Sequence, residues 1–261
     1  MTSRLRWVIV PVLVFTLAGW AGGERACAKD RQPELGAPLH TILEVETTAR
    51  LIAILLDSGR NVINENQGIS DDRGTAEPRL TPEVFERQLL DIFHSRSGID
   101  LRDLEAARIP AGAKKLLKEL VLVSKQVVVE IQLESNRPGS GLKFIPAIFG
   151  ARVATRFTEQ THVRLKQTAL APRNPLNAPD PIERTALEEF ADPSYPRERV
   201  ISEVTTKSGS LRLMFPLYTT RKCLACHGDP QGELDRTSYP REGLSLGQNA
   251  GAISVMIPIQ P

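Results

Sequence analysis

The stretch VISEVTTKSGSLRLMFPLYTTRKCLACHGDP, residues 200–230, contains the signals that decide the fold and the chemistry of this chain. It begins with two β-rich runs, 200–206 and 211–218, which flank the turn formers Ser208 and Gly209. Two such runs around a short turn predict an antiparallel hairpin. The stretch ends with two cysteines three residues apart and a histidine directly after them. The predicted hairpin therefore leads straight into a motif with reactive side chains.

The second run of this hairpin has two different faces, because successive side chains of a strand point to opposite sides. One face is apolar and consists of Leu211, Leu213, Phe215 and Leu217. The other is mixed and consists of Arg212, Met214, Pro216 and Tyr218. We expect the apolar face to pack on the core, and the mixed face to meet a cofactor or solvent.

The rest of the chain divides into an early helical part and a late β-rich part. Apolar residues at three- and four-residue steps predict helices over 40–66, 81–97, 113–132 and 145–160. Within the third, the β-branched run 127–131 could equally be a strand, and we favour helix. Further strands are predicted over 163–170 and 252–259, with a helix over 181–190, and loops over 68–78 and 136–141. Strands that follow several helices predict an α+β domain with a small antiparallel sheet and helices on one face.

The first 28 residues have the features of a secretory signal. Arg4 and Arg6 precede an apolar run over 7–20, and Ala26-Cys27-Ala28 fits the small-residue rule for cleavage after Ala28. Residues 29–39, with Pro33 and Pro38, then form a flexible leader to a single domain over 40–261. We therefore expect a periplasmic or otherwise exported protein.

Two alternatives to cleavage stay open. Cys27 could be a lipoprotein cysteine, although the residues before it lack the leucine and small side chains of such sites. The apolar run could also remain as an uncleaved membrane anchor. If cleavage removes Cys27, the mature chain keeps two cysteines, so no disulfide framework staples the fold.

The motif Cys223-Leu224-Ala225-Cys226-His227 is typical of covalent haem attachment. A tight turn can present both thiols to the two vinyl groups of one haem, while His227 ligates the iron. The predicted export agrees, because haem c is assembled outside the bacterial cytoplasm. The motif therefore predicts one covalently bound haem c, with Cys223, Cys226 and His227 as its binding residues.

Three other chemistries compete for this motif. A zinc site needs more ligands, and His40, His94 and His162 lie far away in the sequence. A redox-active thiol pair normally lies at the start of a helix, whereas Gly228-Asp229-Pro230 stops a helix at once. A disulfide across two intervening residues is strained and leaves His227 unexplained.

Several ordered segments of the chain resemble a family of exported c-type haem proteins, first catalogued as a domain of unknown function. The resemblance runs from about residue 40 to the end and rests on residues 143–150, 165–168, 173–180, 216–218, 223–230, 239–240 and 251–255. It implies a PAS-like fold, with helices packed on the sheet and the haem in the loop before the last strand. In one branch of the family a cysteine on the first helix is the second axial ligand, and the predicted first helix here has none.

The sixth iron position and the role of Arg173 are therefore open. His40, His162, Met214 and Met256 are candidates for the axial ligand, and a vacant or water-occupied position is another possibility. Arg173 could pair with a haem propionate, since its guanidinium suits a carboxylate. It could equally shape the turn-rich connection that follows the strand.

Composition narrows the function further. With 33 basic and 31 acidic residues, the net charge of +2 gives no reason to expect a nucleic-acid partner. We expect a haem c redox or gas sensor, or an electron-transfer protein, that acts through a redox or signalling partner protein. A haem enzyme such as a peroxidase would need a distal acid-base residue and an arginine that the sequence does not reveal, so we expect no catalytic turnover. A haem-free periplasmic binding module is the remaining alternative.

Overall fold

A computed structural model describes residues 39–67, 80–135, 144–205 and 209–259. Within these ranges the helices are α1 (Leu39–Glu65), α3 (Pro82–Ser97), α4 (Ala111–Ser135), α5 (Pro146–Thr161), α6 (Pro181–Ala191) and the single turn α7 (Leu224–His227). The strands are β1 (Arg164–Thr168), β2 (Ile201–Thr205), β3 (Ser210–Tyr218) and β4 (Asn249–Pro258). The predicted helices and strands are all present, and β-branched residues 127–131 lie in α4.

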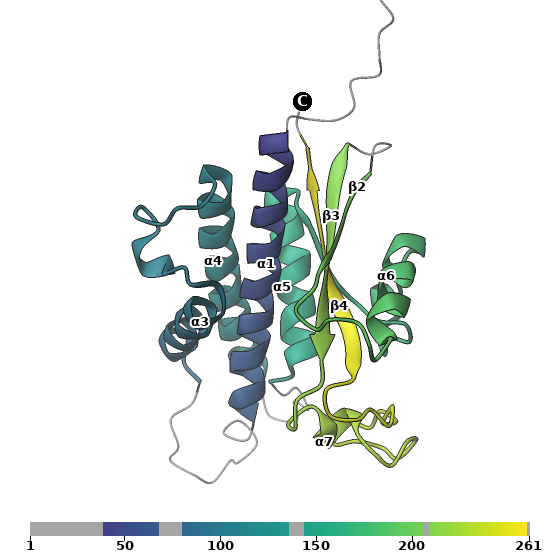
Figure 1. Cartoon of the computed structure of the whole chain (residues 1–261). Helices are drawn as coiled ribbons and strands as arrows, with labels where there is room; N and C mark the ends of the chain where they lie inside the picture. The colour runs from purple at the N-terminus through teal and green to yellow at the C-terminus, as the bar shows by residue number, and fades with distance from the viewer. Residues whose placement is uncertain (1–38, 68–79, 136–143, 206–208, 260–261) are drawn as a thin grey trace, which may run out of the picture. The chain divides into compact units, whose positions relative to one another are not determined.

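The four strands form one antiparallel sheet in the order β1-β4-β3-β2. Strands β2, β3 and β4 are labelled in Figure 1. The hairpin of β2 and β3 pairs Ile201 with Met214 and Thr205 with Ser210. The last strand, β4, lies between β3 and β1, so the chain returns to the middle of the sheet. Tyr218 at the end of β3 pairs with Asn249 at the start of β4. The loop between these two residues therefore leaves and re-enters the sheet at the same end.

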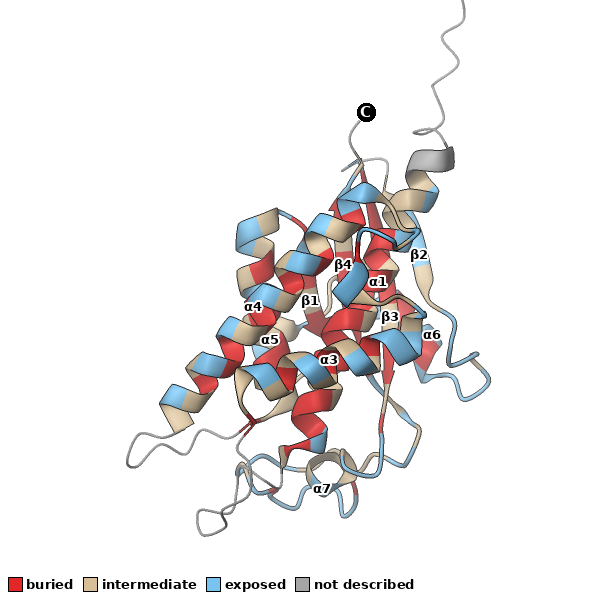
Figure 2. Cartoon of the chain, turned by 90° about the vertical axis from the view of Figure 1, so that its left-hand side faces the viewer, coloured by how far each residue is buried: buried red, intermediate tan, exposed pale blue. Residues whose placement is uncertain are grey.

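Four helices cover the face of the sheet formed by the odd-numbered residues of β3. Helices α1 and α5 lie directly against the strands, and α3 and α4 pack on their far side (Figures 1 and 2). Leu211, Leu213 and Leu217 are buried in this core, as predicted from their alternation. In α4, Val127, Val128 and Ile131 are also buried in it, so burial on one face of a helix outweighs their strand preference. The predicted α+β class, with the N-terminal helices packed on one face of a small antiparallel sheet, is confirmed.

The other face of the sheet corrects one expectation. Met214 is 1% exposed and packs with Ala186, Leu187 and Phe190 of α6. Arg212, on the same face, pairs with Asp180 at the start of that helix at 2.5 Å. The mixed face of β3 is therefore covered at these positions by a helix of the chain itself, and the expectation that a cofactor or solvent meets them is wrong. The mixed polarity of this face indicated that something covers part of it, but it did not indicate that the cover is a helix of the same chain.

Two helix starts show how local sequence fixes the scaffold. The Thr81 hydroxyl accepts a hydrogen bond from the Val84 amide at 3.2 Å, with Pro82 as the first helical residue of α3. At α6, Asp180 and Glu183 form a reciprocal capping box. No helix within the described ranges is both long enough and apolar enough to cross a membrane. The predicted signal (1–28), the leader up to residue 38 and the loops 68–78 and 136–141 lie outside the described residues.

Candidate functional site

The two cysteines of the motif lie on one helical turn. The amides of Cys226 and His227 donate to the Cys223 carbonyl at 3.1 and 2.9 Å, and Gly228 closes the turn by donating to the Leu224 carbonyl at 2.9 Å. Residues three apart in a helical turn lie on the same side, so both thiols face one direction. Both are unbonded and partly exposed. The predicted arrest of the helix at Gly228 is confirmed.

His227 is held by a carboxylate from the far side of the same loop. Its Nδ1 lies 2.8 Å from Oε2 of Glu242, and its side chain is 37% exposed. An imidazole that donates from Nδ1 to a carboxylate presents the lone pair of Nε2 outward, as metal-ligating histidines do. The described residues provide no hydrogen-bond partner for Nε2. The geometry thus leaves free the nitrogen atom that an iron atom would need.

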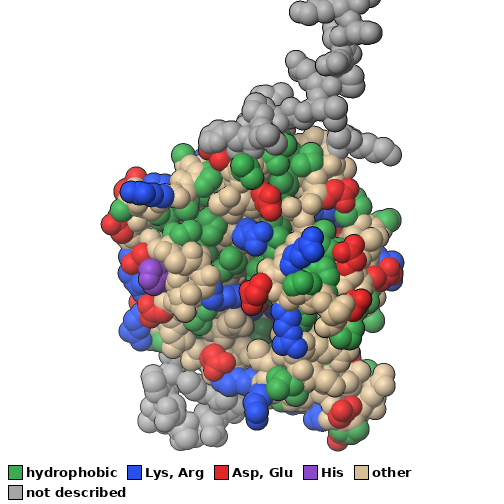
Figure 3. All heavy atoms as spheres, viewed as in Figure 1, with side chains coloured by type: hydrophobic (Ala, Val, Ile, Leu, Met, Phe, Trp, Pro, Cys, Tyr) green, Lys and Arg blue, Asp and Glu red, His purple; other side chains and the backbone are tan. Residues whose placement is uncertain are grey.

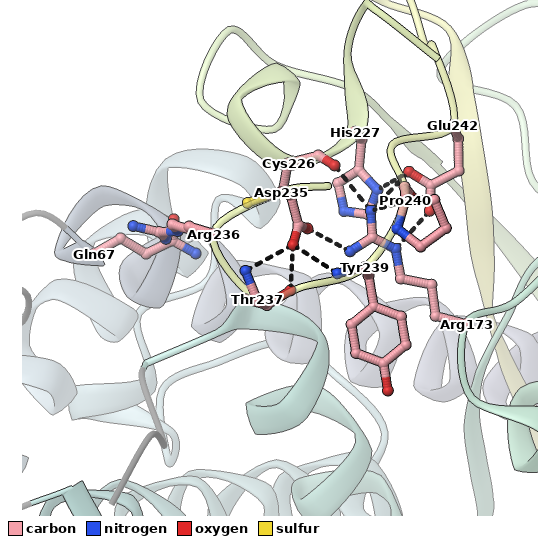
Figure 4. A network of polar contacts seen from close by, with 10 residues as sticks. All are labelled: Gln67, Arg173, Cys226, His227, Asp235, Arg236, Thr237, Tyr239, Pro240 and Glu242. Atoms are coloured by element: carbon pink, nitrogen blue, oxygen red, sulfur yellow. Dashed lines mark hydrogen bonds and ion pairs between the residues drawn. The ribbon is translucent and has the colours of Figure 1, made fainter. Parts of the chain in front are cut away.

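Arg173 reaches the site from the connection between β1 and α6, and its guanidinium joins four groups (Figure 4). Nε and Nη2 donate to the two oxygens of Glu242 at 2.6 and 2.9 Å, and Nη1 donates to Asp235 at 2.6 Å. Nη2 also donates to the Cys226 carbonyl at 2.8 Å and to the Pro240 carbonyl at 3.5 Å. The guanidinium therefore connects the helical turn of the motif to two carboxylates of the loop that follows it, those of Asp235 and Glu242.

Asp235 organises the middle of that loop. Its side chain has no exposed surface, and its Oδ1 accepts from the Thr237 amide, the Thr237 hydroxyl and the Tyr239 amide at 2.7, 2.6 and 3.2 Å. Tyr239 also lies under the guanidinium of Arg173, 5.6 Å from ring centroid to Cζ. The loop is thus closed by one buried carboxylate that faces its own backbone on one side and Arg173 on the other.

The charges of this network shift one another's pKa. Burial alone would raise the pKa of Asp235 and of Glu242. Hydrogen bonds from Thr237 and Arg173 instead hold the pKa of Asp235 below its ordinary range. Hydrogen bonds from Arg173 and His227 do the same for the pKa of Glu242. Burial would lower the pKa of Arg173, and its two carboxylate partners raise it instead. Both carboxylates are therefore anionic and Arg173 is cationic at neutral pH.

The C-terminal end of α1 lies against the same loop. Lys222, directly before Cys223, pairs with the Glu65 carboxylate and donates to its carbonyl at 3.2 Å. Arg236 donates to Gln67 at 2.6 Å. The first helix and the motif, 157 residues apart in sequence, thus meet at one end of the domain.

The candidates for an axial ligand lie elsewhere. His40 is in the first turn of α1, whose 27 residues make it about 40 Å long, and the motif is at its other end. His162 follows α5 and directly precedes β1, whose first residue, Arg164, pairs with Met256 of β4. His162 and Met256 therefore lie at the end of the sheet opposite to the motif. Met214 is buried under α6. The structure brings none of the four to His227.

The competing chemistries of the motif gain no support from the geometry. In the ranges that the structure describes, no group of three or more histidine, cysteine, aspartate or glutamate side chains could hold a metal ion. Cys223 and Cys226 are not joined to each other.

Sequence reasoning missed Glu242 and Asp235. For Asp235, the following Thr237 was an available signal, since an aspartate two residues before a threonine favours a local turn closed by its side chain. Nothing in the sequence around Glu242 links it to His227, 15 residues earlier, or to Arg173, 69 residues earlier. Arg173 itself was predicted as a site residue and lies in the site. Its suggested contact with a propionate stays a prediction, because its donors here face carboxylates of the protein.

Comparison with known proteins yields a family and one solved structure. The solved structure is the crystal structure of the cyanobacterial heme-protein Tll0287, whose sequence is 20% identical to this chain. The match covers 56% of this chain and 98% of that chain, with a TM-score of 0.36. No curated protein matches the chain. The model of the Tll0287-like family, described as Tll0287, matches residues 39–258, nearly the whole span on which the sequence resemblance rests. The chain belongs to the Tll0287-like family.

Proposed function

We propose that this protein is an exported carrier of one haem c, bound covalently through Cys223 and Cys226 and ligated by His227. The observation that carries the proposal is the single helical turn on which two free thiols face one side while Glu242 holds the adjacent imidazole. The donor set fits the group, since two thiols can form thioethers and Nε2 can ligate iron. The membership of a family whose namesake is a heme-protein supports it.

The residues of the loop have definable tasks in such a site. The helical turn orients the two thiols, and the Cys226 carbonyl is held by Arg173 at 2.8 Å. Glu242 selects the tautomer of the neutral His227 imidazole that carries its proton on Nδ1, so that the lone pair of Nε2 faces away from Glu242 and is available to a metal. When bound, haem would supply an iron centre that changes oxidation state or takes up a small ligand.

Production in a host that matures c-type cytochromes tests this assignment. We expect a c-type pyridine haemochrome spectrum and a haem that stays on the polypeptide under denaturing conditions. The double variant Cys223→Ala, Cys226→Ala should lose this covalent haem. Thr220→Val is the matched control, because its hydroxyl lies 3.2 Å from the Cys223 sulfur without belonging to the motif, and it should keep the haem. Wild-type protein without covalent haem would refute the proposal.

Within this function we favour ligand sensing over electron transfer. The proposal is supported by the positions of His40, His162, Met214 and Met256, each of which lies away from the motif. With these four side chains away from the motif, a haem held by Cys223, Cys226 and His227 would supply an iron atom able to take up carbon monoxide or nitric oxide. Addition of carbon monoxide to the reduced protein should shift the Soret band promptly. An unchanged spectrum would favour an electron carrier.

The proposed setting is the periplasm, with the signal passed to a partner protein and no catalytic turnover. Basic and acidic side chains are interspersed on the face that Figure 3 shows, so charge alone does not mark a docking surface there. Mass spectrometry of exported protein tests the location. Cleavage after Ala28 predicts a mature chain that begins at Lys29, and a retained N-terminus would point to membrane anchoring instead.

A further inference from the structure

We infer that Glu242 is a positioning residue for His227 that lowers the reduction potential of the bound iron, and that Arg173 holds Glu242 in place for this task. The inference rests on the proposed haem c function. Nδ1 of His227 lies 2.8 Å from Oε2 of Glu242, so the carboxylate contacts the imidazole directly.

The orientation of Glu242 is fixed independently of His227. Arg173 donates to both carboxylate oxygens, Nε to Oε1 at 2.6 Å and Nη2 to Oε2 at 2.9 Å. A guanidinium that binds a carboxylate through two parallel hydrogen bonds sets the plane of that carboxylate as well as its distance. Oε2 is thus directed at the imidazole by a contact that does not involve the imidazole.

Arg173 is in turn fixed by the rest of the loop. Asp235, fully buried, receives Nη1 at 2.6 Å, and the Cys226 carbonyl receives Nη2 at 2.8 Å. The same guanidinium therefore contacts the carboxylate that faces His227 and the residue that directly precedes His227. If the helical turn moved relative to Glu242, Arg173 could not keep its hydrogen bonds to the Cys226 carbonyl and to Glu242 at the same time.

The chemical consequence follows from the charge of the acceptor. A carboxylate that accepts the Nδ1 proton makes the imidazole a stronger electron donor through Nε2 than a neutral acceptor does. Stronger donation stabilises ferric iron relative to ferrous iron, so the midpoint potential falls. The cation of Arg173 offsets part of the added negative charge, which leaves geometry as its main contribution.

Glu242→Gln separates the charge from the shape, because glutamine keeps an oxygen that can accept from Nδ1. In protein with covalently attached haem, we expect this variant to have a higher midpoint potential than the wild type. The ferrous iron–imidazole stretch in resonance Raman spectra should move to lower frequency. Glu233→Gln is the matched control: Glu233 lies in the same loop with its side chain 57% exposed, faces Arg241 and leaves His227 untouched. It should change neither quantity.

The outcomes separate this inference from the proposed function. Absence of covalent haem in the wild type would refute the function itself. Haem attached in all three proteins, with equal potentials for wild type and Glu242→Gln, would overturn the role of Glu242 alone. If Glu242→Gln does not fold, Glu242→Asp decides, since its shorter side chain keeps the charge but lengthens the contact. It should raise the potential above that of the wild type, and an unchanged potential would again overturn the inference.

Discussion

The helix-covered face of the sheet and the loop between β3 and β4 are held together by different forces. The core beneath the helices consists of apolar side chains, many with no exposed surface, from α1, α3, α4, α5 and the sheet. The loop over residues 219–248 is tied by Arg173, Asp235 and Glu242 around the motif. Apolar burial stabilises without fixing direction, whereas hydrogen-bonded charges fix direction at a high cost of desolvation. The comparison suggests that the core provides stability and the charged loop provides geometry.

Truncation in the core should have the largest effect on stability. Phe149 has no exposed surface and meets the Phe85 ring edge-on at a centroid distance of 5.4 Å. Its ring also lies close to Gly59 of α1, where a Cβ atom would come within 2.9 Å of it. We expect Phe149→Ala to lower the free energy of unfolding by about 3–5 kcal/mol, measured by urea denaturation. Thr155→Ala, on the exposed side of α5, is the control, and an equal loss there would contradict the role of the core.

Replacing the Asp235 acceptor that faces Arg173 with a donor should lower the free energy of unfolding by an intermediate amount. Asp235→Asn can keep the acceptor oxygen that faces Thr237 and Tyr239, but it places an amide donor against Nη1 of Arg173. We expect a loss of about 1.5–3 kcal/mol, because a charged donor loses its partner. Asp229→Asn, an exposed change in the same loop, should be close to neutral. If both variants unfold alike, the network does not order the loop.

Acid should act on the loop before it acts on the core. The pKa of Asp235 is lower in the folded state than in the unfolded chain, where it is about 3.9. The stability that ionised Asp235 contributes to the fold is therefore complete above this unfolded pKa, and it is lost progressively as the pH falls below about 3.9 towards the lower pKa of the folded state. One proton gives at most about 1.4 kcal/mol per pH unit. The free energy of unfolding, measured by urea denaturation from pH 6 down to pH 3, should therefore decrease more steeply with falling pH for the wild type than for Asp235→Asn. Parallel curves would show that Asp235 does not titrate with folding.

The contact between α1 and the motif should matter least. Glu65 and Lys222 have side chains that are 60% and 48% exposed, and solvent screens such pairs. Lys222 also donates to the Glu65 carbonyl at 3.2 Å, a bond that does not depend on the carboxylate. We expect Glu65→Gln to change the free energy of unfolding by less than about 1 kcal/mol in thermal or urea denaturation. A larger loss would mean that this exposed pair orders the loop together with Arg173.

Sequence periodicity was sufficient for most of the scaffold. The alternation of Leu211, Leu213 and Leu217 predicted the buried face of β3, and the helical periodicity over 81–97 predicted α3. These features are local, because a strand period or a helix period depends on residues within one element. The covering of Met214 by α6 was not predictable in this way, since it depends on how the chain folds back after β1.

The candidate site divides along the same line. The sequence by itself determined that Cys223, Cys226 and His227 share one turn, because their spacing and Gly228 act within six residues. Only the tertiary structure decided that Glu242 faces His227, that Arg173 and Asp235 hold it there, and that His40 and His162 lie at the other end of the domain. Hydrogen bonds between residues 15 to 69 positions apart depend on where loops meet in space, and local sequence patterns do not encode that meeting.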